Sequence, residues 1–193
     1  MTFAAFPATA CWRHRGARSG FEVACFRAAA GGWSLDGTTT AVEDGRAWIV
    51  TYSIQLDAAW LTREAHVSTR TAAGPRQARL MSDGAGRWRV DGRPAPQLDG
   101  CLDIDLESSA LTNTLPVHRL ALAPGARAET PAAYVRALDL RTERLDQSYT
   151  RLPGESGPQR YRYAAPAFGF TCTLGFDESG LVLDYPGIAV RAG

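Results

Sequence analysis

Apolar and polar side chains alternate with a period of two along most of this chain. Between Trp48 and Asp57 the even positions are all large and apolar, whereas the odd positions are polar at all but one place. Residues 168–177 repeat the pattern, with Phe, Phe, Cys, Leu and Phe on one face. Such alternation is typical of a β-strand that is buried on one side. A chain dominated by it is expected to fold mainly as β-sheet.

Turn sequences separate these alternating segments at short intervals. Asp83-Gly84 lies between two apolar runs, and Asp177-Glu178-Ser179-Gly180 follows the strand predicted at residues 168–177. Both are typical of hairpins, in which Gly supplies the positive φ angle. Further strands are predicted at residues 20–28, 64–72, 78–81, 88–90, 101–107, 115–122, 134–142, 145–151, 159–165 and 181–185. The pattern therefore predicts about ten or eleven strands, nearly all antiparallel.

Signals for helices and for domain boundaries are weak. Residues 56–65 could form two helical turns, and Pro131 could begin a short helix that reaches Tyr134. The segment 123–133, rich in Ala, Gly and Pro, is more simply a loop. Without a repeat or a linker, the 193 residues predict one domain, 1–193. Because so many strands cannot stay flat and open, we expect one large, strongly curved antiparallel sheet that either packs solidly or encloses a cavity.

The charged residues are balanced and dispersed. The net charge is +1, and all 21 basic residues are Arg. They form no basic block, so we expect no nucleic-acid surface. The amino-terminal segment has no charge before its short apolar run, and no apolar stretch reaches the ~18 to 20 residues that span a membrane. The sequence therefore predicts a soluble, cytoplasmic protein with no signal peptide and no integral membrane segment.

Motifs for metals, cofactors and covalent catalysis are absent. The cysteines and histidines lie at spacings unlike those of metal ligands: Cys11, Cys25, Cys101, Cys172, His14, His66 and His118. The chain contains no Gly-x-Gly-x-x-Gly loop, no Walker loop and no Gly-x-Ser-x-Gly elbow. We therefore expect neither a metal nor a cofactor, and no nucleophilic serine.

Acidic side chains alternate along the strand predicted at residues 101–107. Asp103 and Asp105 point the same way, with backbones ~6.5 to 7 Å apart. An inverting glycosidase needs ~6.5 to 9.5 Å between its acid and its base, so the two could form a catalytic pair. The same spacing is common on the solvated face of ordinary strands, and two carboxylates are too few ligands for a divalent cation.

A cluster of polar residues, Thr112-Asn113-Thr114, contains the only asparagine of the chain. Its hydroxyl and amide groups could bind a sugar or a lipid head group. They could equally cap a turn, with Pro116 at the start of the next strand. Arg119 could pair with Asp103 or Asp105 across strands, or could bind a ligand anion.

Four segments carry a family resemblance. They are residues 88–92 (Trp-Arg-Val-Asp-Gly), 100–106 (Gly-Cys-Leu-Asp-Ile-Asp-Leu), 112–120 (Thr-Asn-Thr-Leu-Pro-Val-His-Arg-Leu) and 180–187 (Gly-Leu-Val-Leu-Asp-Tyr-Pro-Gly). Together with Gly32-Trp33, residues 50–57 and Trp60, they resemble a bacterial family of putative glycolipid-binding proteins over nearly the whole chain. This resemblance implies a spiral β-roll, an open wrapped sheet similar to the half-barrels of periplasmic lipoprotein carriers. It brings no established catalytic or ligand-binding residues.

Three functional hypotheses follow. The leading one is a non-enzymatic protein that holds a glycolipid or acyl ligand on the concave side of the roll. The ligand-binding candidates are Thr112, Asn113, Thr114, Arg119, Asp103, Asp105, Trp88 and Tyr163. The first alternative is a hydrolase acting on a carbohydrate or a lipid ester through Asp103 and Asp105, which requires a cleft and a carboxyl pKa near neutrality. The second is a structural or interaction module with a packed interior.

Overall fold

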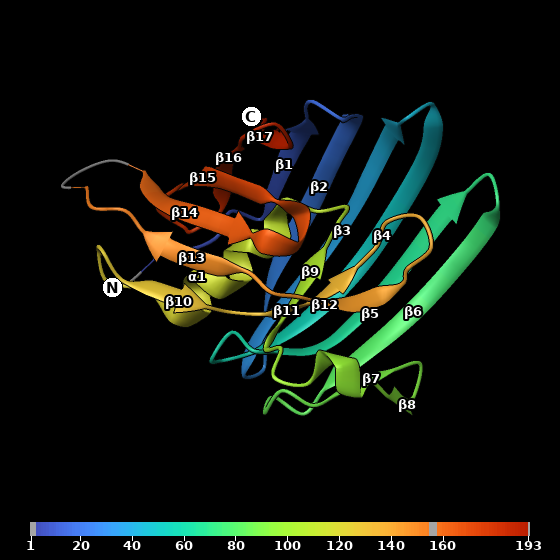
Figure 1. Cartoon of the computed structure of the whole chain (residues 1–193), viewed down its shortest axis with the longest axis horizontal. Coiled ribbons are helices and arrows are strands. Elements are labelled where there is room, and N and C mark those ends of the chain that lie inside the picture. The colour runs from blue at the N-terminus through green and yellow to red at the C-terminus, as the bar shows by residue number, and fades with distance from the viewer. Residues whose placement is uncertain (1–2, 155–157, 193) are drawn as a thin grey trace.

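One antiparallel sheet of 14 strands forms most of the molecule (Figure 1). The computed structural model describes residues 3–154 and 158–192. The strands of this sheet are β1 (Thr9–His14), β2 (Arg18–Ala29), β3 (Gly32–Glu43), β4 (Arg46–Asp57), β5 (Thr62–Thr71), β6 (Gly74–Ser82), β7 (Trp88–Val90), β8 (Arg93–Pro94), β10 (Arg127–Glu129), β13 (Ser148–Arg151), β14 (Gln159–Ala165), β15 (Phe170–Phe176), β16 (Val182–Tyr185) and β17 (Ala189–Arg191). Their order is β10-β13-β14-β15-β16-β17-β1-β2-β3-β4-β5-β6-β7-β8. The sheet is curved and is not closed into a barrel, which confirms the predicted fold class.

The longest strands, β2 to β6, form one wall of the molecule (Figure 1). Strands β3 and β4 pair without interruption from Gly32 opposite Asp57 to Glu43 opposite Arg46. Asp44 and Gly45 close this hairpin with positive φ angles of 49° and 72°, which match the right-handed twist of the paired strands. Along β4 every even position from 48 to 56 is buried. The alternation seen in the sequence is thus confirmed as a sheet with one buried face.

A second, smaller sheet and a helix lie against the inner face of the long strands (Figure 1). These inner elements are β9 (Asp103–Leu106), β11 (Ala132–Val135), β12 (Thr142–Leu145), helix α1 (Thr114–Leu120) and the 3-10 helices η1 (Pro96–Leu98) and η2 (Leu111–Asn113); a third 3-10 helix, η3 (Pro166–Phe168), precedes β15. Strands β9 and β11 are parallel, whereas β11 and β12 are antiparallel. All four residues of β9 are buried. The concave side of the large sheet is therefore occupied by the chain itself.

Strand β9 separates two hydrophobic cores. In the first core, Ile104 and Leu106 pack with the inward residues of the long strands, among them Trp48 and Ile54. The second core gathers Val117, Tyr134, Leu145, Tyr149, Tyr161, Tyr163, Ala165, Leu174, Phe176 and Val182. Because successive side chains of a strand point to opposite faces, Asp103 and Asp105 point away from Ile104 and Leu106. The first core is thus lined by the apolar face of β9, and the second lies on its acidic face.

The strand predicted at residues 115–122 is wrong, because residues 114–120 form helix α1. Leu115 and Val117 are two positions apart, as are Leu120 and Leu122, yet the first turn of the helix is buried on every side from Thr114 to Val117. Pro116 lies in that first turn, where a missing N–H leaves no intrahelical bond unmade. The helix ends at Ala121, which takes a left-handed conformation with φ 42°. Because protein surrounds this turn, its apolar residues need not follow the helical period, and the sequence resembles that of a strand.

Other predictions of helices, loops and strand bounds were wrong in both sheets. Residues 56–65 contain the end of β4 and the start of β5 instead of a helix, and Pro131 precedes strand β11 instead of a helix. The predicted strand 134–142 is two strands joined by a turn, in which Leu140 has a φ of 59°. Strand β10 lies within the predicted loop 123–133, and β1 and β3 were not anticipated. The described residues therefore contain 17 strands, several of them only two to four residues long.

Candidate functional site

The second core contains a cavity of about 220 Å³. Its wall is formed by Arg18, Asp105, Leu106, Glu107, Ser109, Asn113, Tyr134, Leu145, Tyr163, Ala165, Phe168, Phe170, Tyr185 and Ile188. The segment from β9 to the end of η2 supplies four of the five polar groups, and strands β11 and β14 to β16 supply most of the aromatic rings. The cavity therefore has a polar side and an aromatic side. Asn113, the residue that the sequence singled out, is part of its wall.

Larger hollows lie on the outer surface of the sheet. One of about 520 Å³ crosses the outward-facing Thr51, Ser68 and Gln77, and one of about 510 Å³ lies beside β7 and β8. The acidic residues in their walls, among them Asp91 and Asp99, are exposed. The smaller inner cavity is therefore the better candidate for a site, because it alone of the three holds a buried carboxyl group.

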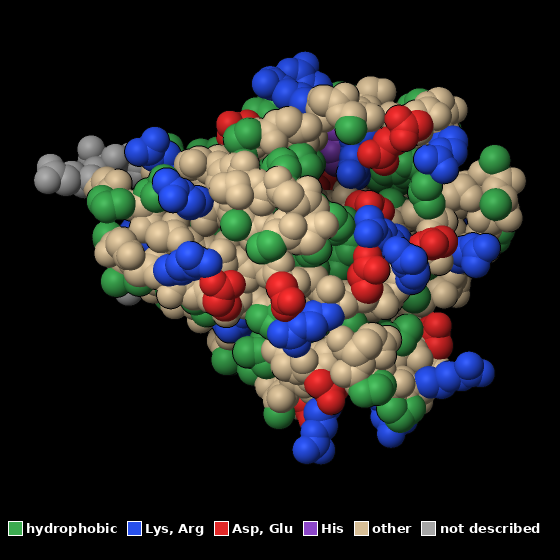
Figure 2. All heavy atoms as spheres, viewed as in Figure 1, with side chains coloured by type: hydrophobic (Ala, Val, Ile, Leu, Met, Phe, Trp, Pro, Cys, Tyr) green, Lys and Arg blue, Asp and Glu red, His purple; other side chains and the backbone are tan. Residues whose placement is uncertain are grey.

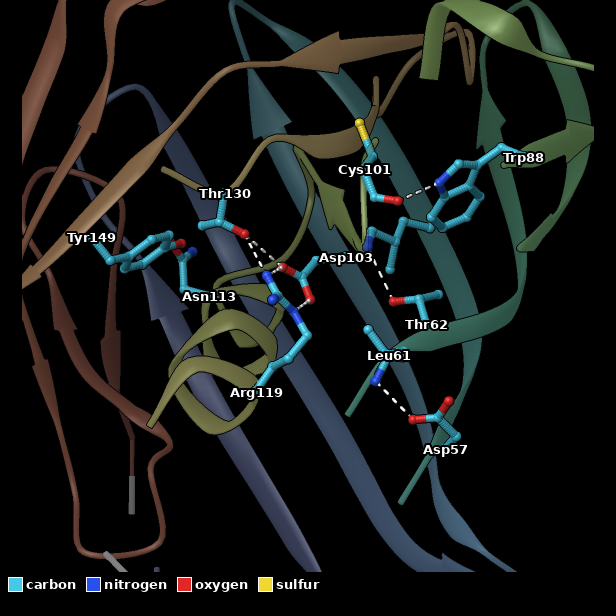
Figure 3. A network of polar contacts seen from close by, with 11 residues as sticks. Asp57, Leu61, Thr62, Trp88, Cys101, Asp103, Asn113, Arg119, Thr130 and Tyr149 are labelled. Carbon is cyan, nitrogen blue, oxygen red and sulfur yellow. Dashed lines mark hydrogen bonds and ion pairs between the residues drawn. The ribbon is translucent and has the colours of Figure 1, made fainter. Parts of the chain in front are cut away.

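Asp103 is wholly engaged by the protein (Figure 3). Arg119 donates from Nε to Oδ1 at 2.9 Å and from Nη2 to Oδ2 at 2.7 Å, and the Thr130 hydroxyl donates to Oδ2 at 3.1 Å. Asp103 is 0% exposed and does not line the cavity. A bidentate pair of this kind fixes α1 against β9. Of the partners considered for Arg119, the structure contains Asp103.

Asp105 lies two residues further along the same face and has a different environment. It is 9% exposed and lines the cavity, and its Oδ1 accepts a hydrogen bond of 2.8 Å from the Thr112 hydroxyl. Burial raises the pKa of Asp105 to about 6, and the carboxylates of Asp103 and Glu107 also act in this direction, whereas the Thr112 bond lowers it. Near neutral pH, Asp105 is therefore a mostly charged group in a largely apolar wall.

Four tyrosines surround Asp105. They are Tyr134, Tyr149, Tyr163 and Tyr185, and burial raises the pKa of each one, with the charge of Asp105 adding to the effect. Their hydroxyl groups consequently keep their protons at neutral pH and can donate hydrogen bonds. Tyr149 donates to Asn113 Oδ1 at 2.7 Å, which orients the Asn113 amide in the cavity wall (Figure 3).

The polar cluster 112–114 does not form a corner between two strands, because it spans the end of η2 and the start of α1. Thr112 supports Asp105, and Asn113 faces the cavity. Thr114 is fully buried at the start of the helix, its hydroxyl has no hydrogen-bond partner among the described residues, and it does not line the cavity. Only part of the cluster therefore contributes to the site.

Trp88 and Tyr163 have opposite outcomes. The Trp88 indole donates to the carbonyl of Cys101 at 2.8 Å in the first core, away from Arg119 and Asn113 (Figure 3). Tyr163 lines the cavity. Of the predicted ligand-binding residues, the structure thus places Asp105, Asn113 and Tyr163 in the cavity wall and Thr112 behind it. Asp103, Thr114, Arg119 and Trp88 lie elsewhere.

Sequence reasoning missed Glu22, which holds the site against the long strands. This carboxylate is 0% exposed and accepts hydrogen bonds from the Tyr52 hydroxyl at 2.6 Å, from the Ala110 amide at 2.8 Å and from the Ser109 hydroxyl. Burial raises its pKa, while these bonds lower it. A signal was present, because Glu22 shares the inward phase of Ala24 and Phe26 on β2. A charged residue at an inward position of a strand needs a buried partner.

An arginine and two aromatic rings flank the cavity. Arg136 donates to Glu107 Oε1 at 3.2 Å, and its guanidinium carbon lies 5.1 Å from the Tyr134 ring centre and 5.3 Å from that of Phe168. Phe168 is 45% exposed. Basic and acidic side chains lie side by side over the β11–β12 hairpin (Figure 2). At the edge of the cavity, charged side chains therefore lie next to the exposed ring of Phe168.

Two structural tests address the classes of function that the sequence set aside. No helix among residues 3–154 and 158–192 is both long and apolar enough to cross a membrane. Within the same residues, no three His, Cys, Asp or Glu side chains are grouped so that they could hold a metal ion.

Known proteins similar to this chain extend over almost its full length. The model of a family described as "Putative glycolipid-binding" matches residues 9–191. A crystal structure of a DUF1089 family protein from Pseudomonas aeruginosa is 34% identical, covers 100% of this chain and 98% of its own, and superposes with a TM-score of 0.77. A β-barrel-like protein of the DUF1849 domain from Brucella abortus is 12% identical, with coverages of 98% and 96% and a TM-score of 0.57, which shows the fold alone. No curated protein matches the sequence.

Proposed function

The chain belongs to the family of putative glycolipid-binding proteins, and on this premise we propose that it binds an amphipathic ligand without altering it chemically. The polar head of the ligand occupies the cavity beside Asn113. The observation that carries the proposal is the pairing of polar and aromatic walls in an otherwise packed interior. Sugar rings offer apolar faces to aromatic rings and hydroxyl groups to carboxylates and amides, so such a cavity suits a sugar head group.

The size of the cavity limits what enters it. Sites for drug-sized molecules have volumes of roughly 300 to 1,000 Å³, so about 220 Å³ accommodates a head group and little more. The concave side of the sheet cannot take an acyl chain, because β9, η2 and α1 pack there. We place the acyl chain of the ligand at the edge of the cavity instead, across the exposed ring of Phe168.

Binding is favoured over hydrolysis by the separation of the two acids. A catalytic pair must face a common substrate. Only Asp105 lines the cavity, whereas both oxygens of Asp103 are bonded to Arg119 or Thr130. A cytoplasmic location is part of the proposal, and it is supported by four cysteines that form no disulfide.

Native mass spectrometry of protein purified from its own host, followed by lipid extraction, tests this function. We expect a bound lipid with a hydroxyl-bearing head group. Phe168→Ser should reduce the bound fraction severalfold, whereas Val42→Ser, which changes an equally exposed residue on the outer face of β3, should not. A wild-type protein that carries no lipid would overturn the proposal.

A further inference from the structure

Two acids line the cavity, Asp105 and Glu107, and among the described residues only Glu107 has an arginine partner. Asp103 pairs with Arg119 at 2.7 Å, Glu107 with Arg136 at 3.2 Å, and Glu43 with Arg18 at 3.7 Å. Asp105 forms no ion pair with any described residue, although it is more deeply buried than Glu107 and Glu43. A buried carboxylate without a counter-ion is costly for a protein to retain.

The free oxygen of Asp105 faces the cavity. Thr112 occupies Oδ1, and none of the described residues donates a hydrogen bond to Oδ2. Oδ2 is also absent from the buried polar atoms that lack a partner, so it retains accessible surface, and the cavity is what Asp105 lines. Among the carboxylate oxygens of Asp105 and Glu107, Oδ2 alone accepts no hydrogen bond from a described residue, and it is available to a ligand in the cavity.

Three aromatic rings in the wall of the same cavity lie close together, with their planes inclined to one another. The ring centres of Tyr163, Phe170 and Tyr185 lie 6.0 to 6.2 Å from one another, and their planes meet at 59° to 80°. Tyr134 adds a fourth ring to the wall. The faces of aromatic rings carry negative charge density and attract cations within about 6 Å, and groups of rings of this kind bind ammonium ions.

From these observations we propose that the cavity selects head groups that carry an ammonium group, with the cationic nitrogen held between Asp105 Oδ2 and the ring faces. This inference rests on the proposed function and names the class of its ligand. An amino sugar and an ethanolamine or choline head group share the required chemistry. Arg18 also lines the cavity, but its guanidinium is held by Glu43, by the Glu107 carbonyl at 2.8 Å and over the Trp48 ring. Its charge is thus directed at the protein.

Calorimetric titration with matched probes tests the proposal. Glucosamine and glucose differ only in an ammonium group against a hydroxyl group, and we expect glucosamine to bind at least about tenfold more tightly. Titrations with choline and with ethanolamine distinguish a lipid head group from an amino sugar as the source of the ammonium. Asp105→Asn should abolish the preference for the amine, since Asn retains an acceptor for Thr112 without the charge. Asp91→Asn is the matched control: Asp91 is exposed at a φ of 50°, which Asn tolerates, and should leave the preference unchanged.

The pH dependence supplies a second readout. Choline keeps its charge at every pH, so its affinity should rise as pH increases through about 6, where Asp105 loses its proton. The charged and titratable groups that face Asp105 are Asp103, Glu107, Arg18, Tyr134, Tyr149, Tyr163 and Tyr185, and none of the tyrosines ionises in this range. Asp105→Asn should show no such rise.

Equal binding of glucose and glucosamine, unaffected by Asp105→Asn, would overturn the ammonium inference and leave the proposed function intact. A protein that binds none of these probes would also contradict the inference, and the lipid content found by native mass spectrometry then decides the proposed function separately.

Discussion

The two cores on either side of β9 differ in what they are built to do. The first core is formed mainly by Trp and aliphatic side chains of the long strands, which pack against Ile104 and Leu106. The second is rich in tyrosine, borders two buried acids and leaves a cavity. Four consecutive residues of one strand supply both environments. The alternation of a single strand thus places the closely packed core on one face and the proposed ligand site on the other.

A contrast of the same kind exists within the second core. Asp103 and Asp105 share a face, yet the first is neutralised by Arg119 and the second forms no ion pair with any described residue. We therefore assign Asp103 to holding the fold and Asp105 to the ligand. Four changes test these assignments, and we take them in order of the effect expected.

The largest effect is expected from Asp103→Ala. It leaves the Arg119 guanidinium, which is 12% exposed, without its counter-ion in the interior. Breaking such a pair from one side lowers the free energy of unfolding by about 3 to 5 kcal/mol, which urea denaturation would measure. The double variant Asp103→Leu with Arg119→Met should lose much less, because no charge is left behind. If the single variant is as stable as the wild type, Asp103 does not hold the fold.

Leu35→Ala probes the packed first core. Leu35 is fully buried in β3, so its truncation removes apolar contacts and leaves a void. The expected loss is about 3 kcal/mol, within the range seen for buried leucines. Ligand binding by the folded variant should match that of the wild type. A large loss of affinity at full folding would show that the two cores are not separate in function.

Asp105→Asn should stabilise the protein at high pH. The pKa of Asp105 is raised to about 6 from 3.8, so the folded state retains a proton that the unfolded state releases between these values. Its contribution to stability is present below about pH 4 and is lost as pH rises to about 6. The free energy of unfolding of the variant, measured relative to that of the wild type, should therefore be up to about 3 kcal/mol larger at pH 8 than at pH 4.

The difference between the wild type and Asp105→Asn isolates the effect of Asp105 on the pH dependence of stability. His14 and His118 have pKa values lowered to about 4 by burial, which destabilises the fold as pH falls below 6.5, and the raised pKa of Glu22 acts in the same direction as that of Asp105. All three groups are present in both proteins and cancel in the difference. Parallel pH profiles of the two proteins would contradict the assignment of Asp105.

The smallest effect is expected from Tyr149→Phe. It removes the hydroxyl that donates to Asn113 and leaves Oδ1 of this amide without its donor. We expect a loss of about 1 kcal/mol in thermal or urea unfolding, together with weaker ligand binding because the amide is free to reorient. Tyr161→Phe is a suitable control in the same core, since among the described residues the Tyr161 hydroxyl bonds only to Gln159, at 3.3 Å. Equal effects of the two changes would contradict a special role for Asn113.

The long strands could be predicted from sequence because their side chains see one apolar and one aqueous face. The alternation from Trp48 to Leu56 reports that geometry directly. The inner elements could not be predicted in this way, because they are surrounded by protein. All of β9 and the first turn of α1 are buried, so these residues have no face exposed to water that would require polar and apolar side chains to alternate. The same reason explains why Asp103 and Asp105 resembled a solvated face.

The cavity was predictable only in part. Asn113, Asp105 and Tyr163 could be named because a lone amide, paired acids and aromatic residues are unusual enough to be noticed in a sequence. Arg119 lies on α1, so the position of this helix decides which of the two acids it pairs with. The helix was not predicted, because residues 115–122 resemble a strand in sequence. Tyr134 and Tyr185 reach the site from segments far apart in the chain, and only the tertiary fold brings them together.

The pairing of β1 with β17 has a consequence for how the protein is made. Trp12 lies opposite Arg191, so two strands that are far apart in the sequence are neighbours in the sheet. A ribosome must release β17 before one edge of β1 can be covered, and contacts between residues so distant in sequence form slowly. During synthesis that edge presents unpaired N–H and C=O groups to other chains. We expect the sheet to be completed only after β17 has left the ribosome, and we expect chaperones that shield strand edges to raise the yield of this protein.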